Sequence, residues 1–256
     1  MRRRHRKPHR IRRKKSIFKK KAFWGLVFSL LLFGTGFYFF VFSDVFQIQA
    51  IIITGEQRVA KESLESIIKA EARNIIFVDS GKIRELVLQK FPQIAELEIK
   101  RDFPNILNLA LAERKEVGVF CQDTRCFLLD GQGVIFEEFT GETSLPKFQN
   151  QTINEELVPG EKVFEKETLD IILEIEARLK EGVGVFSEEI SLVSSERLNT
   201  KTSEGWQIYF NIKNDLNWQI VSLATILEKR LPPEKRKSLE YIDLRFDKIF
   251  VYPQLD

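Results

Sequence analysis

The longest uninterrupted apolar stretch of the chain covers residues 22–43 (AFWGLVFSLLLFGTGFYFFVFS) and contains no charged side chain. At about 1.5 Å of rise per residue, a helix of this length extends about 33 Å, which is enough to cross a hydrocarbon core of about 30 Å. Three lysines at 19–21 precede the stretch and Asp44 follows it. A buried helix of a soluble domain rarely lacks charge over such a length, so the pattern predicts a membrane-spanning helix.

A cleaved signal peptide is the nearest alternative to a retained span. Signal peptides have an apolar run of about 7–15 residues and a cleavage site made of small residues. Here the run is longer, and it ends in the bulky residues 37–42 (FYFFVF). The sequence therefore favours a span that is kept.

The next 70 or so residues alternate between strand and helix patterns in one small unit. Leu64, Ile67 and Ile68 lie at helical spacing, whereas Leu107, Leu109 and Leu111 alternate as on one face of a strand. The predicted order is strand, helix, helix, strand, strand, at residues 47–55, 61–68, 79–91, 94–100 and 106–113. This order predicts an α+β unit with both helices packed on one sheet.

From Val117 onward the pattern consists mostly of strands. Strands are predicted at 117–120, 127–136 (two strands with a Gly-rich turn), 190–193, 206–212, 241–245 and towards Val251, with helices at 169–179 and 216–231. We therefore expect an α+β protein, with a single transmembrane helix before a βααββ domain and a mainly β second domain. The expected parts are a basic tail (1–21), the transmembrane helix (22–43), and two domains (44–114 and 115–256).

The last predicted strand is the candidate binding site. Because it comes last in the sequence, we expect it at a sheet edge, where unpaired backbone groups can accept a partner strand. Side-chain anchors are also needed, since each added backbone bond contributes only about 1 kcal/mol net. The candidate partner-binding residues are Phe246, Lys248, Ile249, Phe250, Val251 and Tyr252. The alternative is that these aromatic residues, and Tyr241, simply belong to the core.

The composition divides the chain into a basic tail and an acidic body. Residues 1–21 contain 13 of the 40 Lys and Arg residues and none of the 37 Asp and Glu residues, so 27 basic and 37 acidic side chains remain in the body. By the positive-inside rule, the tail is expected in the cytoplasm and residues 44–256 outside it. The tail should also attract anionic lipid. Nucleic-acid binding is the weaker alternative, because the tail has no predicted fold and no regular interleaving of aromatic with basic residues.

The only two cysteines, Cys121 and Cys126, are flanked by apolar runs at 117–120 and 127–129. This pattern is typical of a β-hairpin with a four-residue connection. Cysteines that face each other across such a hairpin can form a disulfide in an oxidising compartment. A structural bridge and two free thiols both remain open, whereas a metal site would need two further ligands, and no histidine is near.

Catalytic chemistry has little support in this sequence. Both histidines, His5 and His9, lie in the basic tail, which excludes Ser–His and Cys–His pairs and most zinc sites from the body. Adjacent acidic residues at 137–138, 155–156 and 188–189 point in different directions on a strand or a helix, which indicates solvated charge. There is no Gly-x-Ser-x-Gly elbow and no Gly-rich phosphate loop. We therefore expect a protein that is not an enzyme and needs no cofactor or metal.

Five short motifs occur in a fixed order after the predicted span. They are Phe91-Pro92-Gln93-Ile94, the run 100–107 (KRDFPNIL), Glu113-Arg114, the run 129–136 (LDGQGVIF) and the run 241–246 (YIDLRF). Together they resemble the FtsQ/DivIB family of bacterial cell-division proteins over nearly the whole chain. The sequence departs from that family at 115–118, where the family usually has Pro-Val-Ala, and at 217–219, where it often has a lysine.

The resemblance implies an extracytoplasmic POTRA domain at 44–114 and a role as a non-catalytic scaffold of the division machinery. In that family the terminal strand region receives the FtsB subunit of the FtsB–FtsL pair of single-span coiled-coil proteins. Phe246 takes the place of a contacting Tyr, and Lys248 that of a contacting Ser. The POTRA domain would help to localise the protein to the division septum through other membrane partners.

Two other functions stay open at this point. One is a POTRA-type chaperone or translocation module that handles polypeptides at the cell envelope. It needs a β-barrel or a secretion channel, and no barrel-length series of alternating strands follows the predicted POTRA domain. The other is a membrane-anchored hydrolase that uses carboxylates, for which the sequence nominates no pair.

Overall fold

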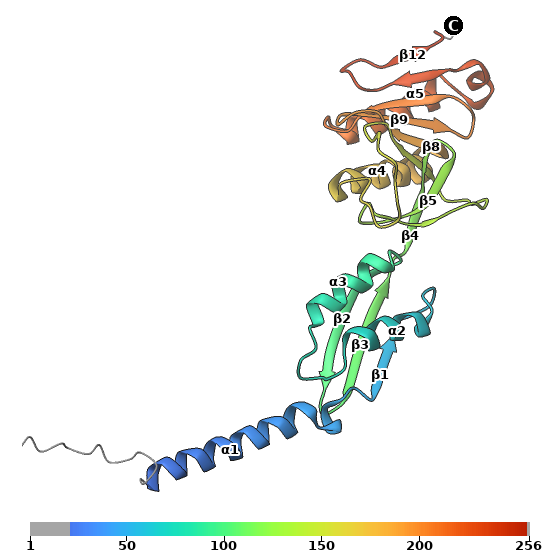
Figure 1. The fold of residues 1–256 in the computed structure, drawn as a ribbon. Helices are drawn as coiled ribbons and strands as arrows, with labels where there is room; N and C mark the ends of the chain where they lie inside the picture. The colour runs from blue at the N-terminus through green and yellow to red at the C-terminus, as the bar shows by residue number, and fades with distance from the viewer. Residues whose placement is uncertain (1–20, 255–256) are drawn as a thin grey trace, which may run out of the picture.

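A computed structural model describes residues 21–254, which form one long helix followed by two domains in line (Figure 1). The helix α1 (Lys21–Phe42) stands apart from both domains, and a single 3-10 turn, η2 (Asp44–Phe46), follows it. Within residues 21–254, α1 is the one helix long and apolar enough to cross a membrane. None of its 18 most apolar consecutive residues is buried inside the protein. The single apolar helix near the N-terminus is thus present where the sequence predicts it.

The first domain has the predicted order of strand, helix, helix, strand, strand. Its elements are β1 (Ala50–Thr54), α2 (Lys61–Glu71), α3 (Ser80–Lys90), β2 (Ile94–Asp102) and β3 (Ile106–Glu113). The sheet order is β1-β3-β2, with β1 parallel and β2 antiparallel to the central β3. Leu107, Leu109 and Leu111 of β3 are buried together with residues of both helices, as the alternation predicts. The βααββ expectation is confirmed.

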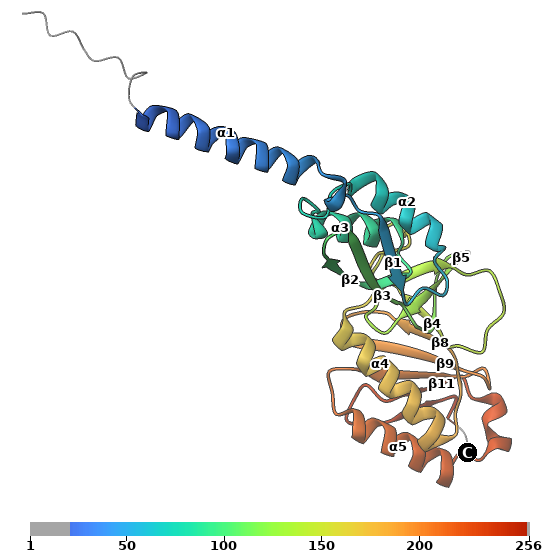
Figure 2. The ribbon, with the colours of Figure 1, turned by 90° about the horizontal axis from the view of Figure 1, so that it is seen from below.

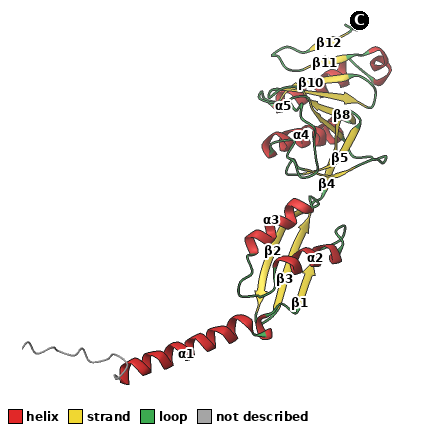
Figure 3. Ribbon diagram, in the orientation of Figure 1, coloured by secondary structure: helices red, strands yellow, loops and turns green. Residues whose placement is uncertain are grey.

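The second domain is built on a single sheet of nine strands. The strands are β4 (Glu116–Gln122), β5 (Arg125–Asp130), β6 (Ile135–Glu138), β7 (Lys147–Asn150), β8 (Ser187–Leu192), β9 (Arg197–Thr202), β10 (Gln207–Asn211), β11 (Tyr241–Asp243) and β12 (Phe250–Tyr252). Their order in the sheet is β12-β11-β10-β9-β8-β7-β4-β5-β6. Figure 3 shows β8, β10, β11 and β12 at increasing distance from the first domain. The expected mainly β second domain is confirmed.

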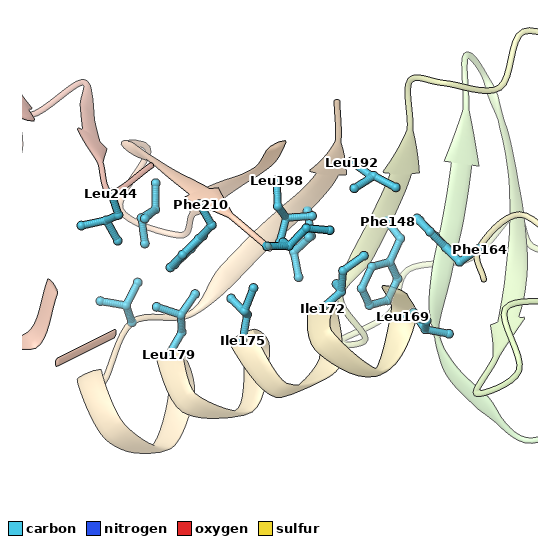
Figure 4. Packing of buried hydrophobic residues seen from close by; sticks show 14 of the residues in the cluster. Phe148, Phe164, Leu169, Ile172, Ile175, Leu179, Leu192, Leu198, Phe210 and Leu244 are labelled. Carbon is cyan, nitrogen blue, oxygen red and sulfur yellow. The ribbon is translucent and has the colours of Figure 1, made fainter. Parts of the chain in front are cut away.

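Two helices cover one face of this sheet. They are α4 (Lys166–Arg178), which continues into the π-helical turn η3 (Leu179–Val183), and α5 (Leu216–Lys229), after which the 3-10 segment η4 (Pro233–Ser238) leads to β11. Figure 2 shows α4 and α5 side by side over the strands. In Figure 4, Ile172 and Ile175 of α4 point toward the strands that contribute Leu198 and Phe210. Burial of these residues and Trp206 makes the main core of the molecule.

Two central strands, β7 and β9, are missing from the sequence-based prediction. Strand β7 (KFQN) has one apolar residue, Phe148, which is fully buried. Strand β9 (RLNTKT) buries two threonines, Thr200 and Thr202, beside Leu198. Neither strand alternates apolar and polar residues, so the sequence pattern that identifies a strand is absent. These residues are buried because neighbouring elements cover them in the folded protein.

Candidate partner-binding site

Strand β12 lies at one end of the nine-stranded sheet. Within residues 21–254 it pairs on one side only, antiparallel to β11, with Val251 opposite Ile242. The sequence-based expectation that the last strand lies at a sheet edge therefore agrees with the structure. Figure 1 places this edge at the end of the second domain farthest from α1.

The backbone of Val251 faces away from the sheet. The Tyr252 carbonyl accepts a hydrogen bond of 2.9 Å from the Glu240 N–H on the β11 side. Because the backbone groups of successive strand residues point to opposite edges, the N–H and C=O of Val251 point to the open edge. These two groups are the ones that an added strand would pair with.

Three aromatic side chains along this segment are exposed to solvent. Phe246, Phe250 and Tyr252 keep 54%, 52% and 50% of their surface accessible. The rings of Phe246 and Phe250 meet edge to face, with centroids 6.0 Å apart and planes at 87°. Phe246 is therefore no core residue, and its contact with Phe250 makes one apolar surface beside β12.

The third aromatic residue, Tyr252, belongs to a ladder of stacked rings on the outer face of the sheet. Its ring lies 5.4 Å from that of Tyr241 on β11, which in turn lies 5.1 Å from that of Tyr209 on β10. The guanidinium of Arg245 lies 5.5 Å from the Tyr209 ring centroid and 5.2 Å from that of Phe246. The ladder fixes the short strand β12 to the sheet through side chains as well as backbone bonds.

The six candidate residues do not all face the same way. Lys248 is exposed on the connection before β12. Ile249 and Val251 are partly buried and pack against the main core, so their side chains stabilise the edge from inside. The structure thus brings Phe246, Phe250 and Tyr252 together on the accessible surface, and leaves Val251 accessible mainly through its backbone.

Two shallow depressions between α5 and this edge extend the surface. One, of about 300 Å³, is lined by Trp218 at the start of α5 and by Phe246. The other, of about 330 Å³, lies between the end of α5 and β12 and is lined by Ile226, Arg230 and Phe250. Sequence reasoning did not place α5 in the site, and the only signal it offered was the presence of a tryptophan near the start of the predicted helix 216–231. Trp218 keeps 38% of its surface exposed.

A bidentate ion pair sits beneath the aromatic surface. The Arg245 guanidinium donates to both carboxylate oxygens of Asp243, with distances of 2.9 and 2.6 Å. These hydrogen bonds raise the pKa of Arg245 above its ordinary value. Because Asp243 is 6% exposed and Arg245 lies against two aromatic rings, the pair holds the start of the β11–β12 connection in place.

The described part of the chain contains no group of three or more His, Cys, Asp or Glu side chains that could hold a metal ion. Of the adjacent acidic residues, Glu138 pairs with Arg125 and Glu188 with Lys201, so these carboxylates form surface ion pairs. Burial raises the pKa of Glu176 on α4.

The two cysteines face each other across the β4–β5 hairpin. Cys121 is the register partner of Cys126, and the two sulfur atoms are bonded at 2.10 Å. The bridge closes the end of the hairpin next to Gln122 and Arg125. A larger depression, of about 560 Å³, lies against β2 and β3 of the first domain, and none of the six candidate partner-binding residues lines it.

Comparison with protein-family models identifies both domains. Residues 46–114 match the POTRA domain, FtsQ-type, and residues 119–245 match the cell division protein FtsQ/DivIB, C-terminal model. The chain belongs to the FtsQ/DivIB family. The resemblance drawn from the five motifs is thereby confirmed, and the first domain is a POTRA domain. Strand β12 lies just beyond the matched segment.

Three cell-division proteins are similar to this chain over long segments. The cell division protein FtsQ of Neisseria gonorrhoeae is 24% identical over 226 residues, covering 87% of this chain and 86% of that protein. FtsQ of Neisseria meningitidis is 23% identical, covering 87% and 89%. FtsQ of Rickettsia felis is 26% identical over 141 residues, covering 48% and 52%. Membership of the FtsQ/DivIB family therefore rests on both domains in the right order and on relatives of similar length.

Proposed function

We propose that this FtsQ/DivIB protein is a non-catalytic, single-pass scaffold of the cell-division machinery. In this proposal its C-terminal edge, residues 246–252, binds FtsB/FtsL-like single-span coiled-coil proteins by β-strand addition. The supporting observation is the open side of β12, where the Val251 backbone and the exposed aromatic rings lie together. The POTRA domain would contact other division proteins of the membrane.

The proposed topology places the basic tail in the cytoplasm and both domains outside. The 13 basic residues before α1 support this orientation through the positive-inside rule. The Cys121–Cys126 bridge also supports it, because disulfides persist in oxidising compartments outside the cytoplasm. The proposed location is the inner or plasma membrane at the division septum.

Strand addition alone would give weak binding, so the side chains around β12 matter. A short strand supplies a few backbone bonds of about 1 kcal/mol net each. Fully burying an aromatic side chain can add about 1.5–3 kcal/mol. Phe246 and Phe250 are half exposed, and a depression lies beside each of them. A partner that covers both rings therefore gains more binding free energy from their burial than from the backbone hydrogen bonds to Val251.

The proposal is tested by affinity capture of the full-length chain from its native cells. We expect two small single-span coiled-coil proteins to be recovered with the unaltered chain. Phe246→Ala or Lys248→Glu should lower their recovery at least tenfold, which corresponds to a loss of about 1.4 kcal/mol of binding free energy. Phe186→Ala is the matched control, since Phe186 is 53% exposed and lies just before β8, away from β12. Recovery of the same partners by all variants would refute the surface assignment.

Cellular localisation separates this function from a role in handling polypeptides. A fluorescent fusion is expected at the septum if the protein is a division scaffold. Uniform staining of the envelope would instead favour a POTRA-type chaperone or translocation module.

A further inference from the structure

Three exposed apolar side chains lie at the end of the POTRA domain that is nearest α1. Val45 of η2 is 54% exposed, Phe77 between α2 and α3 is 61% exposed, and Phe103 in the β2–β3 turn is 59% exposed. Figure 1 shows the end of β2 and the start of β3 beside the end of α1. Large apolar side chains exposed together indicate an interaction surface.

Backbone hydrogen bonds join the three segments that carry these side chains. The Phe46 carbonyl accepts from the Ile75 N–H at 2.9 Å, and the Arg73 carbonyl accepts from the Ile48 N–H at 3.0 Å. On the other side, the Asn105 carbonyl accepts from the Gln49 N–H at 3.0 Å. The segment after α1 is therefore bonded to both loops, and the three form one surface, which we call the membrane-proximal tip (residues 44–46, 73–78 and 102–105).

Phe77 is exposed although its neighbours are held firmly. Arg101 donates to the Val78 carbonyl at 2.6 Å and to the Ile76 carbonyl at 3.3 Å, on either side of Phe77. The side chain of Val78 is 5% exposed and packs in the domain core. Because Arg101 immediately precedes Asp102 and Phe103, the same residue links both aromatic loops. The outward position of Phe77 is thus fixed by its surroundings.

The tip is tied closely to the end of the proposed span. Only three residues separate Phe42, the last residue of α1, from Phe46, and an extended chain covers at most about 3.6 Å per residue. The rings of Phe40 and Phe46 also contact each other, with centroids 4.8 Å apart. If α1 crosses the membrane, Phe46, whose carbonyl is bonded to Ile75 of the tip, must lie within about 14 Å of the point where the helix leaves it.

We propose that Phe77 and Phe103 are seated in the interfacial region of the leaflet from which α1 emerges, so that the POTRA domain rests on the lipid surface. This inference depends on the proposed membrane span. The occupant is lipid, because the short connection to α1 and the backbone bonds of residues 46–49 to both loops keep these loops close to the end of the proposed span. Aromatic side chains are favoured at this depth.

The charges at the tip indicate a shallow position with no preference for anionic lipid. Asp44, Asp79 and Asp102 lie next to the apolar positions, while Arg73 and Lys100 are exposed nearby. Both signs are present, so the rings provide the attraction and the charged groups stay at headgroup level. A tip seated in this way would set the orientation of the whole body and the height of the C-terminal edge above the membrane.

The test uses the full-length chain, with its disulfide intact, in nanodiscs of zwitterionic phosphatidylcholine. A spin label is attached in turn at Phe77→Cys, Phe103→Cys, Phe33→Cys within α1 and Phe186→Cys in the second domain. These four phenylalanines are all at least half exposed. The ratio of oxygen to nickel-chelate accessibility then reports whether each label is in lipid or in water.

We expect the ratios at 77 and 103 to be shifted from the aqueous value at 186 toward the lipid value at 33. Aqueous values at 77 and 103, with a lipid value at 33, would overturn this inference and leave the proposed span intact. An aqueous value at 33 would overturn the span and the inference together.

Discussion

Arg114 at the end of the POTRA domain and Asp130 at the end of β5 form an ion pair that joins the two domains. The side chains are 16% and 5% exposed, and Arg114 also donates to the Pro92 carbonyl at 2.9 Å. Asp130 in turn accepts from the N–H groups of Gln132 and Val134 in the β5–β6 turn. The Glu-Arg and Leu-Asp-Gly motifs of the sequence therefore meet at the domain junction.

The first prediction concerns this ion pair. Arg114→Ala should lower the free energy of unfolding by about 2 kcal/mol, because it leaves the buried Asp130 carboxylate without its cation. Asp130→Ala should lower the free energy of unfolding further, since it also removes the acceptor of the hydrogen bonds from the Gln132 and Val134 N–H groups. Denaturant unfolding followed by circular dichroism measures both.

The control is Arg58→Ala, which breaks the more exposed Arg58–Glu116 pair, with side chains 37% and 35% exposed. Exposed pairs contribute less than about 1 kcal/mol. An Arg58→Ala loss as large as that of Arg114→Ala would contradict the importance assigned to the buried pair.

The second prediction concerns Gly133 in the same turn. Gly133 has φ of +83°, and a Cβ built there would lie 2.1 Å from the Phe164 carbonyl oxygen. Gly133→Ala should therefore destabilise the second domain by more than about 2 kcal/mol, through backbone strain and a contact that must shift. Gly205→Ala has a similar φ of +95° but open space around its Cβ, so it isolates the cost of the clash. Equal losses of stability in the two variants would show that the contact with the Phe164 carbonyl is unimportant.

The third prediction is a pH dependence set by Glu113. Burial acts to raise the pKa of this carboxyl, but the N–H groups of Gln57, Arg58 and Val59 donate to it, and its pKa is lowered from 4.5. A carboxyl with a lowered folded-state pKa contributes stability that is present above the unfolded pKa and is lost as the pH falls through the folded value.

The stability lost in Glu113→Gln should consequently be largest near neutral pH and should shrink as the pH is lowered below 4.5. The melting temperatures of both proteins, measured between pH 7 and acid, give this difference directly. A difference that stays constant over the whole range would rule out ionisation of Glu113 as its cause.

The sequence alone predicts the architecture well, because most elements carry their own signal. The uncharged run at 22–43 and the alternation of Leu107, Leu109 and Leu111 identify α1 and β3 without reference to other elements. Strand β9 has no such signal. Its buried Thr202 is accommodated by a hydrogen bond from its hydroxyl to the Trp206 carbonyl, which is a contact that only the folded chain provides.

The candidate site is predictable only in part, for a related reason. Residues 249–252 (IFVY) are all apolar, so the sequence cannot show that Phe250 and Tyr252 face solvent while Ile249 and Val251 face the core. The depressions beside β12 depend on α5, which is more than 20 residues away along the chain. Their existence follows from tertiary packing and not from any local pattern.

The most direct test of the account is amide hydrogen exchange at Val251 in the full-length protein, with and without its coiled-coil partners. In the free protein this N–H points to the open edge of the sheet and should exchange rapidly. If the partner adds a strand to β12, exchange at Val251 should slow by at least tenfold on binding, while the amides of Tyr252 and Phe250, already directed toward β11, should change less. A complex that forms with no protection at Val251 would contradict strand addition at the C-terminal edge.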